Sequence, residues 1–375
     1  MKLFLIAGEP SGDALGAALM DGLRHLDPSV RVHGVGGPAM IARGLDSLFP
    51  MERLSVMGLA EVLPRLRELF ALRDRAAAAA LDLDVDALIT IDSPDFSLRV
   101  ASKVRASRPG LRTIHYVAPS VWAWRPGRAD HMAACIDHVL ALLPFEPPYM
   151  RAAGMTCDFV GHPVVAAPRA TAAQAAAFRG ALTGRPILVL PGSRRSEVTR
   201  LAPVFGEALH RVPDDRVAVV PTLPHLVDLV VERTASWPRK VKIVSQPIDR
   251  MSAFASADAA LAASGTVSLE LAANGVPMVV AYDMAWLSRV ILARLMKVDT
   301  VTLVNLVSET RAIPEFLGRN CKPGPIGGAL ADLLTVPSLR DRQRDALDRT
   351  MDRLGRGGEA PGLRAARSTL AAIAR

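Results

Sequence analysis

The chain has 375 residues, of which 50% are apolar and 22% are charged, so an intrinsically disordered protein is excluded. Its net charge of +8 comes with only 5% aromatic residues and no basic run interleaved with aromatics, which argues against nucleic acid as a partner and leaves a mild attraction to anionic surfaces. No apolar run reaches the ~18 residues that a membrane-spanning helix needs. Three scattered cysteines predict no disulfide framework and no metal site, as expected in a reducing cytoplasm.

Short apolar runs alternate with helical patterns along the chain. This β-loop-α alternation predicts parallel sheets with helices on both faces, hence an α/β protein with two Rossmann-like domains. The first series of expected strands covers residues 3–7, 32–35, 87–91, 113–117, 138–142 and 156–160, with helices such as 14–26 and 96–106 between them. The second series covers residues 187–190, 217–220, 241–244, 259–262 and 278–281.

A stretch rich in alanine, proline and glycine separates the two series. Beyond Pro337 the chain is helical and its charges alternate in sign, which is typical of a solvated helix with i,i+3 and i,i+4 pairs. We therefore expect an N-terminal domain at 1–165, a linker with one helix at 166–185, a C-terminal domain at 186–336 and C-terminal helices at 337–375.

The loop after the first strand, G-E-P-S-G-D at 8–13, opens a helix. Ligands of open α/β sheets bind outside the carboxyl ends of the strands, where this loop lies. The alternative is an ordinary turn whose glycines serve only its geometry. Four residues are therefore candidates for an acceptor-binding cleft: Glu9, Ser11, Gly12 and Asp13.

The segment 34–39 formally matches the G-x-G-x-x-A dinucleotide fingerprint. The match is weak because Pro38 stiffens the turn and no acidic residue closes a clear βαβ unit about 20 residues further on. We therefore expect no dinucleotide cofactor.

The segment 55–75 places apolar residues at helical spacing among arginines. Such a stripe is usually core, but a basic collar and Pro64 also suit a helix that lies at a membrane interface. The two interpretations are equally weighted at this point. The residues that would contact lipid are Leu59, Leu63, Leu66 and Phe70.

Asp92 ends the third expected strand and is followed by Ser93 and Pro94, which suit the start of a helix. A carboxylate facing the crevice can accept a proton from an attacking hydroxyl if burial raises its pKa from the usual ~3.9. The alternative is a solvated loop acid. The aromatic block at 115–124 then adds His115 and Trp122 as candidates for a cleft wall, although a lone histidine is more often a core residue.

Two segments, 189–198 and 263–270, each predict a strand, a small-residue loop and a helix. Such loops present backbone N–H groups and a positive dipole end to an anion, and Arg194 adds a planar cation suited to phosphate. Glu270, one turn into the second helix, is placed to accept hydrogen bonds from two ribose hydroxyls. We expect a diphosphate site for a nucleotide-linked substrate at Gly192, Ser193, Arg194, Ser264, Gly265 and Thr266.

Eight blocks together resemble the lipid-A-disaccharide synthase family, in that family's order across most of the chain. They are G-E-P-S-G-D (8–13), S-V-M-G-L-A-E-V-L (55–63), I-D-S-P-D-F (91–96), H-Y-V-A-P-S-V-W-A-W (115–124), L-P-F-E (143–146), F-V-G-H-P (159–163), L-P-G-S-R (190–194) and A-S-G-T (263–266).

The resemblance implies the GT-B fold, two Rossmann-like domains facing each other across a cleft. It implies an inverting transferase that joins UDP-2,3-diacylglucosamine to 2,3-diacylglucosamine 1-phosphate, forming the β(1→6) lipid A disaccharide and UDP. Asp92 matches the family's candidate base and Arg194 an arginine important for activity. Ser264–Thr266 and Glu270 fit the nucleotide site, and Asn305 matches a leucine–asparagine step, with Val304 where proline is common.

The resemblance further implies acylated substrates, peripheral association with the cytoplasmic surface of the inner membrane, and a homodimer with exchanged C-terminal segments. We expect no metal and no cofactor. Acylated substrates favour lipid contact for segment 55–75. Two rivals remain: a UDP-N-acetylglucosamine 2-epimerase or other UDP-sugar transferase of the same fold, and a two-lobed binding protein without catalysis, which would ordinarily carry an export signal.

Overall fold

The computed structural model describes residues 1–54, 59–123, 127–284 and 298–374, without the side chains of 59–63. The chain forms two compact units. Unit 1 comprises Met1–Ala166 and Gly357–Arg375, and unit 2 comprises Ala167–Arg356. No helix in the described part of the chain is both long and apolar enough to span a bilayer.

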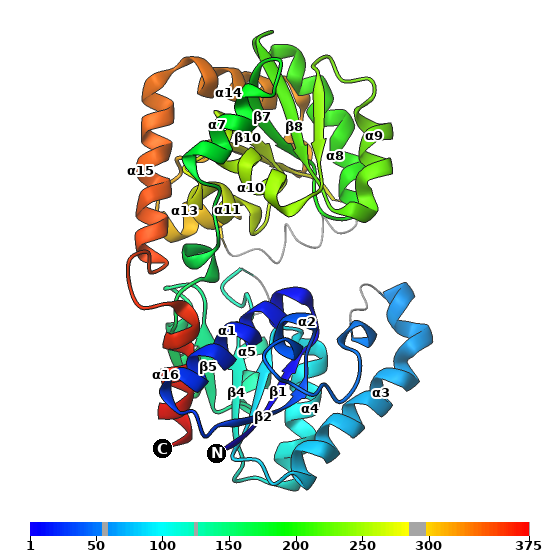
Figure 1. Ribbon diagram of the computed structural model, residues 1–375, viewed down its shortest axis with the longest axis vertical. Helices are drawn as coiled ribbons and strands as arrows, with labels where there is room; N and C mark the ends of the chain where they lie inside the picture. The colour runs from blue at the N-terminus through cyan, green and yellow to red at the C-terminus, as the bar shows by residue number, and fades with distance from the viewer. Residues whose placement is uncertain (55–58, 124–126, 285–297, 375) are drawn as a thin grey trace. The chain divides into compact units, whose positions relative to one another are not determined.

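Unit 1 is built on a parallel six-stranded sheet in the order β2-β1-β3-β4-β5-β6 (Figure 1). The sequence places every one of these strands to within one residue at either end, because each is a short apolar run bounded by polar or turn residues. The strands are β1 (Lys2–Ala7), β2 (Arg31–Val35), β3 (Ala87–Ile91), β4 (Arg112–Tyr116), β5 (His138–Ala141) and β6 (Thr156–Phe159).

Helices cover both faces of this sheet, so unit 1 has two apolar cores. On β1, Phe4 and Ile6 point into one core while Leu3 and Leu5 point into the other, as the alternation of side chains along a strand requires. The helices are α1 (Pro10–Leu26), α2 (Pro38–Ile41), α3 (Leu59–Asp82), α4 (Pro94–Ser107), α5 (Arg128–Ala133), α6 (Pro147–Ala152) and α16 (Pro361–Ile373).

The C-terminal helix α16 packs directly against α1, although the two lie at opposite ends of the sequence (Figure 1). Glycines permit the close approach. A Cβ on Gly22 would lie 2.6 Å from the carbonyl oxygen of Gly362, and one on Gly362 would lie 2.5 Å from that of Ala18. The last helix is therefore part of the first unit's core.

Unit 2 contains a second parallel six-stranded sheet, in the order β12-β11-β10-β7-β8-β9. The three-residue edge strand β12 was not predicted, since it is too short to show a pattern and all three of its residues are only partly buried. The strands are β7 (Arg185–Leu190), β8 (Arg216–Pro221), β9 (Val241–Val244), β10 (Ala259–Ala262), β11 (Met278–Tyr282) and β12 (Glu315–Leu317).

The helices of unit 2 begin with the helix expected within the linker segment 166–185. They are α7 (Ala172–Gly180), α8 (Arg195–Ala208), α9 (Val227–Thr234), α10 (Pro247–Ser256), α11 (Val267–Ala273), α13 (Leu303–Ser308), α14 (Pro323–Thr335) and α15 (Pro337–Arg353). Short 3-10 helices lie at Met51–Arg53, Pro163–Ala166, Leu209–Arg211, Pro224–Leu226 and Gly318–Asn320.

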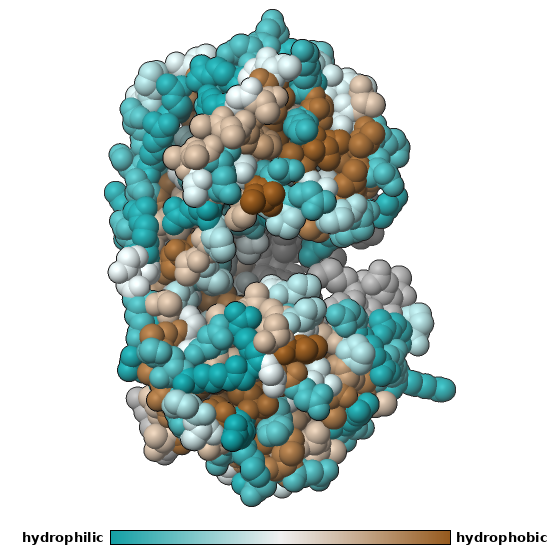
Figure 2. Space-filling view, viewed as in Figure 1, coloured by the Kyte–Doolittle hydropathy of each residue, from teal (hydrophilic) through white to brown (hydrophobic). Residues whose placement is uncertain are grey.

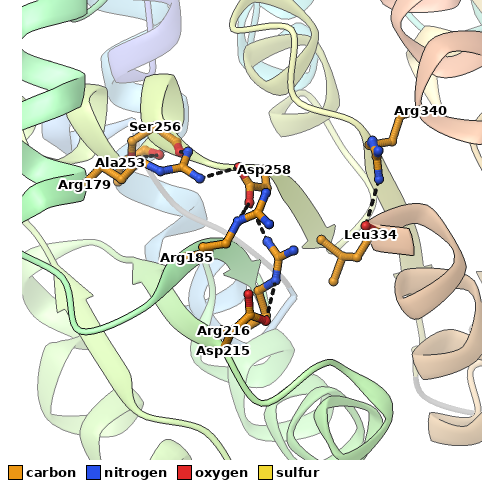
Figure 3. A network of polar contacts seen from close by, with 9 residues as sticks. All are labelled: Arg179, Arg185, Asp215, Arg216, Ala253, Ser256, Asp258, Leu334 and Arg340. Carbon is orange, nitrogen blue, oxygen red and sulfur yellow. Dashed lines mark hydrogen bonds and ion pairs between the residues drawn. The ribbon is translucent and has the colours of Figure 1, made fainter. Parts of the chain in front are cut away.

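Helix α7 packs on α10 and belongs to unit 2, so the segment 166–185 is not simply a linker. An ionic cluster also holds α7 against the sheet of unit 2 (Figure 3). Asp258, at the amino end of β10, pairs with Arg179 of α7 at 2.8 Å, with Arg185 of β7 at 2.9 Å and with the buried Arg216 of β8. Burial opposes ionisation of Asp258, but these arginines outweigh it and lower the pKa of the carboxyl.

The residues after 336 do not form one separate C-terminal segment either, because α15 belongs to unit 2 and α16 to unit 1. The buried Gln343 of α15 bonds both backbone groups of Met278, accepting from its N–H at 2.7 Å and donating to its carbonyl at 3.0 Å. The outer face of α15 is hydrophilic, as its alternating charges predict (Figure 2).

Candidate active site

A cavity of about 310 Å³ lies in unit 2, at the carboxyl ends of β7, β8 and β10. Parallel α/β sheets bind ligands at this edge. Residues of the two loops that the sequence predicted to bind a diphosphate lie together in this cavity. The predicted residues that line it are Gly192, Ser193, Arg194, Ser264, Gly265, Thr266 and Glu270.

The loop before α8 differs from the expectation in one respect. Its backbone N–H groups are not unpaired, because the Glu197 carboxylate accepts hydrogen bonds from Ser193 N at 2.9 Å and from Arg194 N at 3.3 Å. The other carboxylate oxygen lies 3.3 Å from Arg194 Nη1. An acidic residue in the first turn commonly caps a helix in this way, so the position of Glu197 in the sequence is itself a signal for this contact.

Glu270 lines the cavity as expected, but it has a partner that no motif indicated. Arg250 Nη2 of α10 lies 2.5 Å from Glu270 Oε2, and both side chains are about two-fifths exposed. Arg250 also lines the cavity. The pair joins α10 to α11, so only the tertiary fold could reveal it.

Thr222, just after β8, is a further cavity residue that the sequence analysis missed. Its side chain is buried, and its hydroxyl has no hydrogen-bond partner among the described residues. A buried hydroxyl without a hydrogen-bond partner destabilises the folded protein. Such a group is suited to a ligand that supplies the missing hydrogen bond.

Asn305 does not line this cavity, in contrast to the expectation from the family pattern. It is buried, and its amide donates to the carbonyl of Ile313 at 2.9 Å while accepting from the same residue's N–H at 3.0 Å. The side chain thus closes the turn after α13. We therefore remove Asn305 from the proposed nucleotide-binding residues.

In unit 1, Asp92 lies where the backbone is strained. Asp92 and Ser93 have φ values of 52° and 44°, and Val117, which follows the neighbouring strand β4, has φ of 86°. Positive φ is uncommon outside glycine and is an outlier for a β-branched residue. Strained residues of this kind cluster at functional sites. The two strained turns are joined by a hydrogen bond from Asp92 N to the carbonyl of Tyr116 at 2.9 Å.

The loop after β1 lies beside Asp92, because β1 and β3 are paired neighbours. A Cβ on Gly8 would lie 2.7 Å from Ser93 Oγ and 3.1 Å from Ser93 Cβ, so the two loops approach closely at this glycine. Glu9 is half-buried and Ser11 exposed at the same edge, whereas Gly12 is buried against the carbonyl of Ile91. Glu9 and Ser11 therefore stay candidates for substrate contact, and Gly12 serves packing.

Asp13 has a structural role, in contrast to the expectation that it lines an acceptor-binding cleft. Its buried carboxylate accepts hydrogen bonds from the N–H groups of Gly37 (2.9 Å), Ala39 (2.8 Å) and Met40 (2.9 Å), at the start of α2. These are backbone donors of the segment that resembled a dinucleotide fingerprint. A protein carboxylate thus already fills the position that a cofactor phosphate would need.

His115 is a core residue rather than part of a cleft wall. Its ring is buried in the sheet, with Nδ1 2.7 Å from Thr90 Oγ1. Burial, with a smaller contribution from the charge of Arg128, lowers the pKa of His115 to about 4. It is therefore neutral near pH 7.

Trp122 is anchored by the block L-P-F-E. Its ring packs edge-on against Phe145 at 5.1 Å, and Nε1 donates to Glu146 Oε1 at 3.3 Å. Glu146 is itself buried and also accepts from Leu143 N at 2.9 Å. Burial raises the pKa of Glu146 to about 7, although these hydrogen bonds oppose the shift. Two blocks of the family pattern thus form one contact.

On α3, Leu66 is half-buried and Phe70 is 40% exposed, with the Arg73 guanidinium 5.0 Å from the centre of its ring. The side chains of Leu59 and Leu63 lie outside those described. Part of the basic collar is neutralised, since Arg65 pairs with Glu68 at 3.0 Å.

The fold is shared with solved structures of low sequence identity. The UDP-GlcNAc 2-epimerase of Neisseria meningitidis bound to UDP-GlcNAc matches with a TM-score of 0.64 at 10% identity, over 100% of both chains. MurG of Acinetobacter baumannii matches with a TM-score of 0.60 at 14% identity, over 100% of this chain and 99% of that chain. Together with the two parallel sheets, these likenesses define the class: a GT-B protein.

Sequence comparison then identifies the family. A family model described as lipid-A-disaccharide synthetase matches residues 3–359. The lipid-A-disaccharide synthase of Ruegeria pomeroyi is 57% identical, over 99% of this chain and 95% of the relative. That of Rhodospirillum centenum is 47% identical, over 100% of this chain and 95% of the relative. The chain belongs to the lipid-A-disaccharide synthase family, and it is a glycosyltransferase that forms the lipid A disaccharide.

Proposed function

We propose that this glycosyltransferase inverts the donor's anomeric centre, joining UDP-2,3-diacylglucosamine to 2,3-diacylglucosamine 1-phosphate. The products are the β(1→6)-linked disaccharide and UDP. The observation that carries the proposal is the unit 2 cavity, in which two small-residue loops, Arg194 and Glu270 converge. A cation, helix N-termini and a diol acceptor are the groups that a nucleoside diphosphate requires.

In the proposed reaction, the oxygen of the acceptor's 6-hydroxyl attacks C1 of the donor sugar, and Asp92 takes the proton of this hydroxyl. The bond from C1 to the β-phosphate oxygen breaks, and the leaving UDP carries away the electron pair. Arg194 and the N-termini of α8 and α11 stabilise the negative charge that develops on the phosphate. A single displacement of this kind inverts the configuration at C1. The strained turn at Asp92 supports this role, because residues with unfavourable φ values cluster at functional sites. The N–H of Ser93 donates to Asp92 Oδ1 at 2.9 Å and so holds one oxygen of the carboxylate.

We also propose that the protein associates with the membrane surface through α3 and forms a homodimer with exchanged C-terminal segments. The exposed Phe70 and the nearby arginines support the first proposal. The second would carry α16 of one chain onto α1 of the other, forming between chains the contact that joins these helices here. Light scattering of the purified protein reports the number of chains.

The function is tested by mixing the protein with both acylated glucosamine substrates and analysing the products by mass spectrometry. We expect a disaccharide 1-phosphate and one UDP per coupling, with a β anomeric coupling constant in the NMR spectrum. Release of free 2-epimerised sugar without a disaccharide would instead support the epimerase alternative. An α-linked product would contradict inversion while leaving the transferase assignment intact.

A further inference from the structure

The N-terminus of α8 already holds an anion, the carboxylate of Glu197. This carboxylate accepts from two consecutive backbone N–H groups and pairs with Arg194, which the proposed function assigns to the phosphates. A side chain of the protein thus occupies the donors that a diphosphate would use.

Glu197 is held there from several sides. Only 13% of its side chain is exposed. Tyr282, at the end of β11, donates its hydroxyl to Glu197 Oε1 at 3.3 Å. The loop itself fits closely around the carboxylate, since a Cβ on Gly192 would lie 2.5 Å from Glu197 Cβ. Gly192 has φ of 122°, a conformation that favours glycine.

A phosphate and the Glu197 carboxylate cannot both use this N-terminus. The helix offers few unpaired N–H groups, and two anions within hydrogen-bond distance of the same donors repel each other. Arg194 has the same conflict, because its pairing with Glu197 directs the guanidinium at the carboxylate. The cavity independently indicates a ligand, since the buried Thr222 hydroxyl that lines it has no partner among the described residues.

We propose that Glu197 is a displaceable resident anion of the diphosphate site. It caps α8 until the nucleotide's phosphates take over the N–H groups of Ser193 and Arg194, and its displacement releases the Arg194 side chain to the phosphates. Glu197 thereby lowers the affinity for UDP and sets a threshold that only a highly charged ligand overcomes. This inference rests on the proposed function, because it takes the ligand of the cavity to be a nucleoside diphosphate.

The test is calorimetric titration of the full-length protein with UDP and with uridine. Glu197→Gln keeps an oxygen that can accept from the loop but removes the competing charge. We expect UDP to bind about tenfold more tightly to this variant, as is reasonable for a partly buried charge at a helix N-terminus. Uridine has no phosphate to displace the carboxylate, so its affinity should not change. A general reshaping of the cavity would alter both affinities.

Glu207→Gln provides the matched control. Glu207 lies on the same helix with its side chain 66% exposed, so the variant makes the same change in net charge away from the loop. We expect its affinity for UDP to equal that of the unmodified protein.

Tyr282→Phe is a second variant that leaves Glu197 in place. It removes one donor that holds the carboxylate, so UDP should bind about two- to threefold more tightly. This variant decides the question if Glu197→Gln does not fold.

Unchanged or weaker UDP binding in both variants, with UDP bound by the unmodified protein, would overturn the resident-anion role and leave the proposed function standing. Failure of the unmodified protein to bind UDP would overturn both, because the cavity would then not be a nucleotide site.

Discussion

At the scale of single residues, Asp92 combines an ordinary side chain with an unusual backbone. Its φ is 52°, that of Ser93 is also positive at 44°, and the nearby Val117 is strained as well. A sequence pattern points to an acid at the end of a strand, but it carries no record of dihedral angles. The strain became visible only in the folded chain, and it supports the choice of Asp92 over its neighbour Asp95 as the base.

We predict that Asp92→Asn lowers kcat by about 10³-fold, since removal of a general base typically costs that much. Asparagine tolerates positive φ, so the variant should fold normally. Asp95→Asn is the matched control, because Asp95 lies three residues away with its side chain 95% exposed. Steady-state kinetics with both substrates measure the effect. Full activity in Asp92→Asn would exclude the base assignment.

Buried titratable groups make stability depend on pH. The pKa of Glu146 rises from 4.5 to about 7 on folding, so the folded state holds the proton more tightly than the unfolded state. Glu146 therefore makes its whole contribution to the free energy of unfolding below pH 4.5. This contribution is lost as the pH rises towards 7. His115 has the opposite sign, because its lowered pKa makes the folded state lose stability as the pH falls from 6.5 towards 4.

We predict that Glu146→Gln abolishes the loss of stability that Glu146 causes as the pH rises from 4.5 to 7. Relative to the unmodified protein, the variant should gain about 3 kcal/mol of stability between pH 4.5 and pH 7, while the His115 contribution cancels in the difference. Urea unfolding across this range measures it. Glu52→Gln, at an exposed position of the same unit, should give no such trend. A parallel pH profile for Glu146→Gln would show that Glu146 is ionised in the folded protein.

At the scale of elements, one carboxylate connects a helix and three strands. Asp258 binds arginines from α7, β7 and β8 at the edge of the sheet opposite the cavity. The partners are 73 and 79 residues away for Arg185 and Arg179, so no local pattern links them. This contact explains why α7 belongs to unit 2.

We predict that Asp258→Asn destabilises unit 2 by about 3 kcal/mol, because the Arg216 side chain, only 5% exposed, loses its buried carboxylate partner and keeps only the exposed Asp215. Asp215→Asn removes the other carboxylate near Arg216, but Asp215 is 54% exposed, so the loss should be below about 1 kcal/mol. Thermal unfolding measures both. Equal losses in the two variants would contradict the central role of Asp258.

Helix α3 carries the proposed membrane contact. We predict that replacing Leu66 and Phe70 together by serine lowers binding to vesicles containing anionic lipid while leaving the unfolding midpoint within a few degrees, since Phe70 is exposed. Vesicle co-sedimentation measures the effect. Tyr149→Ser removes another exposed aromatic residue of unit 1 and should have no effect. Unchanged binding of the double variant would assign α3 an ordinary structural role.

At the scale of the whole molecule, the chain begins and ends in the same unit. The last helix packs on α1, while the intervening α15 belongs to unit 2. The chain therefore enters unit 2 once and returns, so unit 1 depends on a segment that is distant in sequence.

We predict that a chain ending at Arg356 loses stability in unit 1, because the face of α1 that contacts Gly362 and Ala366 becomes exposed. UDP binding should persist, since every residue that lines the cavity belongs to unit 2. Hydrogen exchange resolves the two units separately. Equal protection of unit 1 with and without the last helix would contradict this dependence.

Much of the architecture follows from the sequence alone. Strands of a parallel sheet are covered by helices on both faces, so each appears in the sequence as a short apolar run between turn residues. The strands other than β12, and the two cavity loops, were predictable for this reason. What only the tertiary structure decided is how polar side chains pair. Asp13 and Glu197 cap helices, Asn305 closes a turn, and Arg250 joins Glu270 from another helix. A carboxylate has the same local sequence signature whether it meets a substrate or a backbone amide, and only the three-dimensional position of its partner separates the two.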